Sequence, residues 1–209
     1  MFYLCLPFQF HSMNRISCLF LLASIVFASC SQDPQPAASP APEVKANCSY
    51  SRNEKDPLGK QIRVTDEAKF ISLNFPESDV KALARDQELV KGYLSCLNVD
   101  TLLGIYFSFN IYSDNAFETY GGIKRGNKIV FTLKSGKIVD VPFARTFSGN
   151  TNLSVGFTEY SSYAFLSRSN AASLQSEEIQ SVRVYWWKMD EAYTVVNPKV
   201  FMNLLPCVQ

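Results

Sequence analysis

The chain has 209 residues, of which 47% are hydrophobic and 19% charged, a composition typical of a globular protein that buries one full core. Its formal net charge is +1, and no stretch gathers a large excess of lysine and arginine. A nucleic-acid-binding protein normally shows a clustered basic excess, so we expect no nucleic acid among its partners.

An apolar run lies near the N-terminus, at residues 16–27 (ISCLFLLASIVF), directly after Arg15. It is shorter than the stretch of about 20 apolar residues that a membrane-spanning helix needs. A basic residue, a short apolar run and small residues at its end are typical of a secretory signal peptide. Residues 1–12 carry no positive charge, which favours Met13 as the start of translation.

The apolar run ends in Ala28, Ser29 and Cys30. These residues resemble the lipobox of bacterial lipoprotein signal peptides, in which cleavage precedes a cysteine that receives lipid. The resemblance implies a signal peptide over residues 1–29, lipidation of Cys30 and contact with a membrane through that lipid. Phe27 departs from the pattern, because an aliphatic residue is usual there, so cleavage by ordinary signal peptidase nearby stays an alternative.

A segment rich in proline, alanine and serine follows at residues 31–45 (SQDPQPAASPAPEVK). It holds too little apolar surface to offset the entropy of ordering, so we expect residues 30–46 to be a lipidated cysteine with a disordered tether. The layout resembles the lipoproteins of diderm bacteria, which implies a location in the cell envelope, at the outer membrane. That resemblance implies no particular activity.

The only histidine, His11, precedes the expected cleavage site. Its removal excludes nucleophilic schemes that need imidazole and zinc sites with histidine ligands. We expect no cofactor and no metal, and we identify no catalytic residue.

From residue 47 onward, apolar and polar residues alternate, which indicates strands rather than helices. Asp56 to Gly59 has the pattern of a type I turn, and Lys134 to Lys137 that of a hairpin turn. The alternation is clearest over residues 103–111. Pro142 cannot donate a ladder hydrogen bond, which predicts an edge strand or a strand end there.

Three segments have helical character: residues 77–86, a short turn near residues 173–179, and a C-terminal helix. In the last, we expect Asn197 to be the cap and Pro198 the first helical residue, and we expect the helix to end at Pro206. With eight or nine strands, this predicts an α+β, mainly β fold over residues 47–209. We expect a single domain, built as an antiparallel sandwich or a strongly curved sheet with the C-terminal helix packed on it.

Three cysteines remain besides Cys30 in the exported part. Cys96 lies on the apolar side of its strand and is expected to be a buried free thiol. Cys48 opens the domain and Cys207 nearly closes it. Because the ends of domains often lie close together, we predict a Cys48–Cys207 disulfide.

Aromatic residues offer the strongest candidates for a binding surface. If Trp186 joins the core, Arg183, Tyr185 and Trp187 face the other way. We expect the C-terminal helix to cover that face. If exposed, it is a platform for a glycan or a partner protein. Tyr106 and Tyr112, on the polar side of residues 103–111, form a second, weaker candidate.

The pairs of neighbouring acids, Asp66–Glu67, Glu177–Glu178 and Asp190–Glu191, are expected to be solvated turn residues. The sequence therefore favours a lipid-anchored envelope protein that binds a protein or glycan ligand without catalysis. The alternatives are a carboxylate-dependent enzyme acting on envelope polysaccharide, which needs two facing carboxyl groups, and a purely structural lipoprotein.

Overall fold

The computed structural model describes residues 48–76, 88–152, 154 and 156–209. The signal peptide, the lipidated Cys30, the tether and the helix at residues 77–86 are all expectations that lie outside the described residues. The described part confirms a mainly β fold in a single domain with three short helices. The strands are β1 (Tyr50–Lys55), β2 (Gln61–Thr65), β3 (Ala68–Asn74), β4 (Glu88–Val99), β5 (Leu102–Ile111), β6 (Lys128–Leu133), β7 (Ile138–Pro142), β8 (Asn150–Asn152), β9 (Phe157–Phe165), β10 (Ile179–Tyr185) and β11 (Asp190–Val195). The helices are α1 (Ala116–Tyr120), α2 (Arg168–Ser176) and α3 (Val200–Val208).

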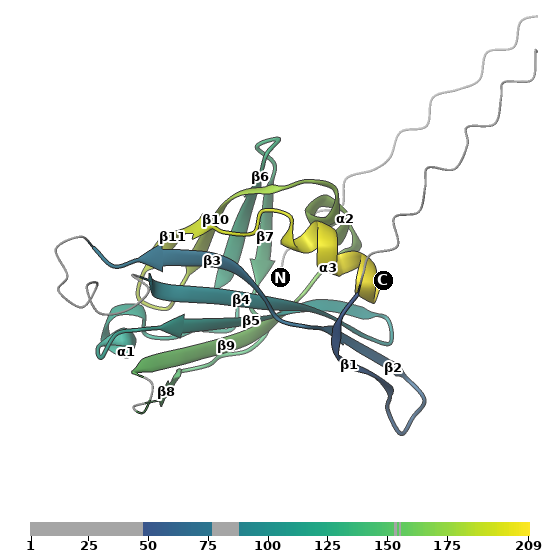
Figure 1. The fold of residues 1–209 in the computed structure, drawn as a ribbon, viewed down its shortest axis with the longest axis horizontal. Coiled ribbons are helices and arrows are strands. Elements are labelled where there is room, and N and C mark those ends of the chain that lie inside the picture. Colours follow the sequence, from purple (N-terminus) through teal and green to yellow (C-terminus); the bar gives the residue numbers. More distant parts are fainter. Residues whose placement is uncertain (1–47, 77–87, 153, 155) are drawn as a thin grey trace, which may run out of the picture. The chain divides into compact units, whose positions relative to one another are not determined.

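All these strands belong to one antiparallel sheet, and all but β1 and β2 follow the order β7-β6-β10-β11-β3-β4-β5-β9-β8 (Figure 1). The long strand β4 pairs with β5 over its whole length. Its other edge is shared, since β3 pairs with its first half and β2 with its second half, while β1 pairs with β2. The sheet therefore branches at the end of β4 that lies beside β2.

Contacts between distant strands show that the sheet is strongly curled. Phe107 of β5 lies 6.5 Å, between ring centroids, from Phe131 of β6, although four strands separate β5 from β6 in the hydrogen-bonded order. Phe131 in turn makes an edge contact with Phe201 of α3, at 5.1 Å. The core lies inside this half-barrel, and the fully buried rings of both halves fill it.

The two longer helices pack against each other at one end of the half-barrel, and α1 lies at the other end (Figure 1). Helix α3 also contacts β2 and β4, and α2 contacts β7. Ser167 caps α2, since its Oγ accepts a hydrogen bond from the amide of Asn170 (3.1 Å). Helix α2 thus begins earlier than the turn predicted near residues 173–179. No described helix has both the length and the apolar character needed to cross a membrane.

The predicted bounds of the C-terminal helix were wrong at both ends, because α3 begins at Val200, after Lys199, and continues to Val208. Pro206 removes one backbone donor, but tertiary contacts hold the turn around it. Tyr50 Oη donates to the carbonyl of Cys207 (2.8 Å), and Asn98 Nδ2 donates to that of Val208 (2.7 Å).

Both turn predictions are confirmed. The amide of Gly59 donates to the carbonyl of Asp56 (2.9 Å), and Gly136 closes the β6–β7 hairpin through the carbonyl of Leu133 (2.8 Å). Pro142 ends β7, which is an edge strand, as its missing donor predicts.

The cysteine predictions are also confirmed. Cys48 and Cys207 form a disulfide with their Cα atoms 5.6 Å apart, which ties the start of the domain to the last turn of α3. Cys96 is a fully buried free thiol whose pKa is raised by burial. A thiol in that state is a poor nucleophile, so its position is explained by packing.

Candidate functional site

The two neighbouring tryptophans divide between core and surface. Trp186 is buried with Val182 and Val184, as predicted, and its Nε1 donates to Tyr193 Oη (2.9 Å). Trp187 points the other way and is 52% exposed. The expectation that the C-terminal helix covers this face was wrong, because α3 packs on β2, β4 and α2 instead.

The aromatic side chains near β10 are already engaged with cations. The Nζ of Lys124 lies 3.6 Å from the ring centroid of Trp187, and that of Lys128 lies 5.4 Å from the Tyr185 ring. Arg183 forms an ion pair with Asp190. Each group predicted to contact a ligand here therefore has a partner within the chain.

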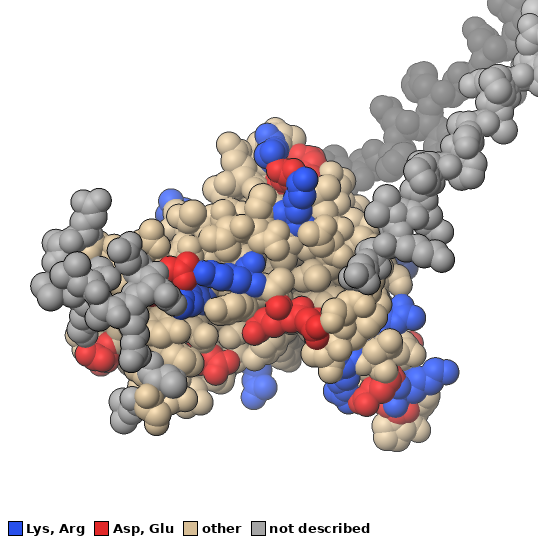
Figure 2. Space-filling model, viewed as in Figure 1, with Lys and Arg blue, Asp and Glu red and all other residues tan. Residues whose placement is uncertain are grey.

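Tyr106 and Tyr112 lie on a different surface. They belong to the outer side of the sheet at β5, and β11, β3 and β4 separate them from β10. Tyr106 stands in register with Ser95 and Tyr163 of the adjacent strands. The Tyr112 ring lies 5.4 Å from that of Phe157, so it too is packed against a neighbour. Figure 2 shows acidic and basic side chains interspersed on the visible face.

The pairs of neighbouring acids differ in burial, and not all of their residues are solvated turn residues as expected. Asp190 is exposed, but Glu191 is half-buried and accepts a hydrogen bond from Tyr120 Oη (3.0 Å). Burial raises the pKa of Glu67, and the negative charge of Glu159 raises it further. Within the described ranges, no three acids, cysteines or histidines are grouped as a metal site would require.

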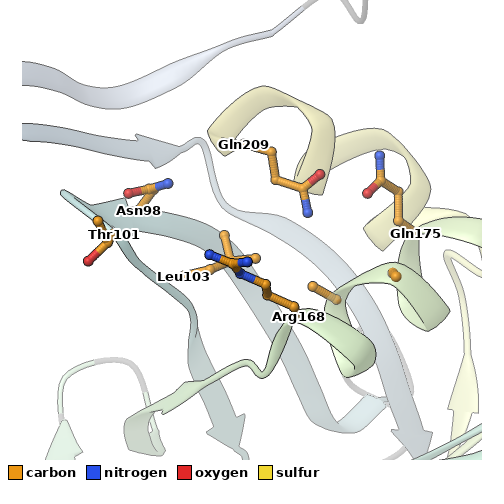
Figure 3. A pocket seen from close by; sticks show the side chains of 8 residues that line it. Asn98, Thr101, Leu103, Arg168, Gln175 and Gln209 are labelled. Atoms are coloured by element: carbon orange, nitrogen blue, oxygen red, sulfur yellow. The ribbon is translucent and has the colours of Figure 1, made fainter.

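A hollow of about 300 Å³ lies where α2 and the end of α3 approach the β4–β5 hairpin (Figure 3). Helix α2 contributes one face to it, because its lining residues recur at intervals of three and four positions and therefore share a side of the helix. The two small alanines on that face leave room between the helix and the sheet. The lining residues are Asn98, Thr101, Leu103, Arg168, Ala171, Ala172, Gln175 and Gln209.

The β4–β5 hairpin tip is held firmly, and it places Thr101 at the rim of the hollow. Asp100 has a left-handed backbone (φ 59°), which aspartate tolerates in tight turns. Its amide donates to the carbonyl of Gln61 (2.9 Å), and its carboxylate forms an ion pair with Lys60 at 3.7 Å. The rim is thus tied to β2 and its preceding loop.

Most polar side chains of the hollow make no hydrogen bond to the described part of the protein. Asn98 uses its amide nitrogen on the carbonyl of Val208. In the described part of the chain, the side chains of Thr101, Gln175 and Gln209 make no hydrogen bond, and that of Arg168 makes neither a hydrogen bond nor an ion pair. A concave site with several unpaired donors and acceptors is the usual form of a small-ligand site, so the hollow is our candidate functional site.

Sequence reasoning did not find this site. Its residues come from β4, β5, α2 and the chain end, and only the fold brings them together. One signal was present: Arg168 follows the helix-capping Ser167, at the end of a helix where a cation is unfavourable.

Comparison with protein-family models, with curated proteins and with solved structures found no significant match to the chain.

Proposed function

We propose that this protein is a lipid-anchored envelope protein whose β-rich domain binds a small polar ligand in the hollow beside α2. The observation that carries the proposal is the set of unpaired polar side chains that converge there, Arg168 above all.

The anchor in this proposal rests on Cys30 and the short apolar run before it. The Cys48–Cys207 disulfide supports export, because disulfides persist in oxidising compartments and are rare in the cytosol. A tether over residues 31–45 in an extended form gives a reach of roughly 45 Å from the membrane surface.

Replacement of the acceptor cysteine tests the anchor. We expect Cys30→Ala to lose lipid label and to leave the membrane fraction, because no thiol remains to carry the lipid. Cys18→Ala, inside the apolar run, is the matched control and should keep both. If Cys30→Ala stayed membrane-bound with its lipid label, the lipoprotein proposal would be refuted.

An array of oligosaccharides from peptidoglycan and lipopolysaccharide, probed with the detergent-solubilised full chain, tests binding. Ala172 is exposed and lines the hollow, so Ala172→Trp fills the site without entering the core. Ala192, exposed on β11, is the control position for the same substitution. Binding lost in Ala172→Trp and kept in Ala192→Trp supports the proposal, and equal binding by both contradicts it.

A second candidate function is hydrolysis of envelope polysaccharide by a pair of carboxyl groups. The observation that favours it is the electrostatic interaction between Glu67 and Glu159, which raises the pKa of Glu67. Release of reducing ends by the full chain, abolished in both Glu67→Gln and Glu159→Gln, would establish this activity.

A further inference from the structure

Arg168 occupies a position that helix stability does not explain. It is the first residue of α2, and the positive end of the helix dipole disfavours a cation there by about 0.3–1 kcal/mol. No described acid forms an ion pair with it, and its side chain is exposed at the edge of the hollow. Its guanidinium is therefore open to a group from outside the chain.

Among the residues that line the hollow, Arg168 alone has a charged side chain. None of its lining residues has an acidic side chain. The nearest acids in the sequence are engaged elsewhere: Asp100 pairs with Lys60, and Glu177 accepts a hydrogen bond from the amide of Ser135 (3.1 Å). Arg63 adds a second guanidinium close by, since it donates to the backbone carbonyl of Gln209 (3.4 Å). An anionic group is therefore the natural partner of Arg168.

The remaining lining groups both donate and accept hydrogen bonds. Figure 3 shows Arg168 extending from α2 toward Leu103, with Gln175 and Gln209 on the side of α3. The Nδ2 of Asn98 donates a hydrogen bond to the carbonyl of Val208 in α3, which leaves its Oδ1 as an acceptor for a ligand. Phosphate at neutral pH is mainly an acceptor, so it would leave the side-chain oxygens of the hollow without a donor. Hydroxyl groups both donate and accept hydrogen bonds, so they would pair with the oxygens and with the amide nitrogens.

We propose that the hollow binds an acidic sugar residue, with its carboxylate on Arg168 and its hydroxyls on the surrounding amides and Thr101. This inference rests on the proposed binding function and names the ligand class of the same site. Leu103 and the two alanines offer an apolar surface to the C–H groups of the sugar ring. A volume of about 300 Å³ is at the small end of ligand pockets and suits one or two sugar units.

Calorimetric titration of the detergent-solubilised full chain tests the inference, with glucuronate and its disaccharides as acidic probes and the matching glucose saccharides as neutral ones. We expect the acidic probes to bind at least tenfold more tightly. Arg168→Gln should abolish that preference. Arg168→Lys keeps the charge but loses the two-pronged guanidinium geometry, so it should retain only part of the affinity. Arg125→Gln, which removes another exposed arginine, is the matched control and should behave as wild type.

The outcomes separate this inference from the broader proposal. Equal binding of acidic and neutral probes, or an unchanged acidic preference in Arg168→Gln, overturns the acidic-sugar assignment and leaves a binding function intact. If neither kind of probe binds, the assignment is also overturned, and the oligosaccharide array then decides the binding function. Because Arg168 opposes the helix dipole, Arg168→Gln should not lower the melting temperature, so lost binding cannot be attributed to unfolding.

Discussion

The disulfide between Cys48 and Cys207 closes a loop that spans almost the whole domain, with a sequence separation of 159. Removing this cross-link should therefore destabilise the protein strongly. The double variant Cys48→Ala/Cys207→Ala makes the change without leaving a single reactive thiol at either position.

The magnitude follows from the entropy of the unfolded chain. In the chain-entropy model, a loop of that length lowers the free energy of the folded relative to the unfolded state by about 5 kcal/mol at 25 °C. For a domain of this size, each kcal/mol corresponds to roughly 2–4 °C, so the melting temperature should fall by roughly 10–20 °C. This is a large share of the 5–15 kcal/mol that typically stabilises a folded domain.

Urea unfolding followed by tryptophan fluorescence measures the effect, because Trp186 is buried in the core. Wild-type protein treated with reductant is the matched comparison, and it should unfold at the urea concentration of the double variant. The double variant itself should not respond to reductant. A loss of less than about 1 kcal/mol would refute the entropic argument.

Two further predictions concern packing and charge. Gly92→Ala on the inner face of β4 would place a Cβ 2.3 Å from Ile71 Cγ1 and 2.8 Å from Cδ1, so we expect overpacking to cost about 1–3 kcal/mol in urea unfolding. In an Ile71→Ala background the cost should largely vanish, and an undiminished cost would show that the clash is not its origin. Glu67 has a pKa above its ordinary value of 4.5, from burial first and Glu159 second, so the folded state holds its proton more tightly than the unfolded state. Its contribution to stability is present at low pH and is lost as the pH rises above 4.5, so Glu67→Gln should become more stable relative to wild type over that rise. A parallel pH dependence of the two proteins, in thermal melts from acidic to neutral pH, would contradict this.

The local patterns of the sequence predicted strands such as β6 and β9 because buried and partly exposed positions alternate along them. Residues 103–111 alternate without a break, and β5 covers Leu102–Ile111. The inner position of Phe70 was not predictable in the same way. The pairing of β3 with β4 shifts register between Lys69 and Ile71, so Phe70 and Ile71 are both fully buried although they are neighbours.

The curvature of the sheet and the helices that cover it could not be predicted from the sequence, and they decide which surface is open to a ligand. The alternation of Arg183, Tyr185 and Trp187 shows that they share a side, but it does not show which helix lies over that side. The answer depends on where α3 docks, and the last turn of α3 is held by Cys48, Tyr50 and Asn98, which lie more than 100 positions earlier in the sequence. Apart from the disulfide, which the positions of the cysteines predicted, contacts between residues more than 100 positions apart have no local signature. The hollow beside α2 therefore escaped prediction, and exposure of Trp187 was only the alternative to a covered face.

The same long-range contacts give the disulfide a second role. Cys207 precedes Gln209, which lines the hollow, and Val208 between them accepts the hydrogen bond from Asn98 on the opposite wall. The cross-link to Cys48 therefore holds one wall of the hollow as well as the start of the domain.

If residues 31–45 form a tether from lipidated Cys30, that tether joins the domain within a few residues of Cys48, next to the proposed binding site. Loss of the disulfide should therefore loosen ligand binding at urea concentrations too low to unfold the domain.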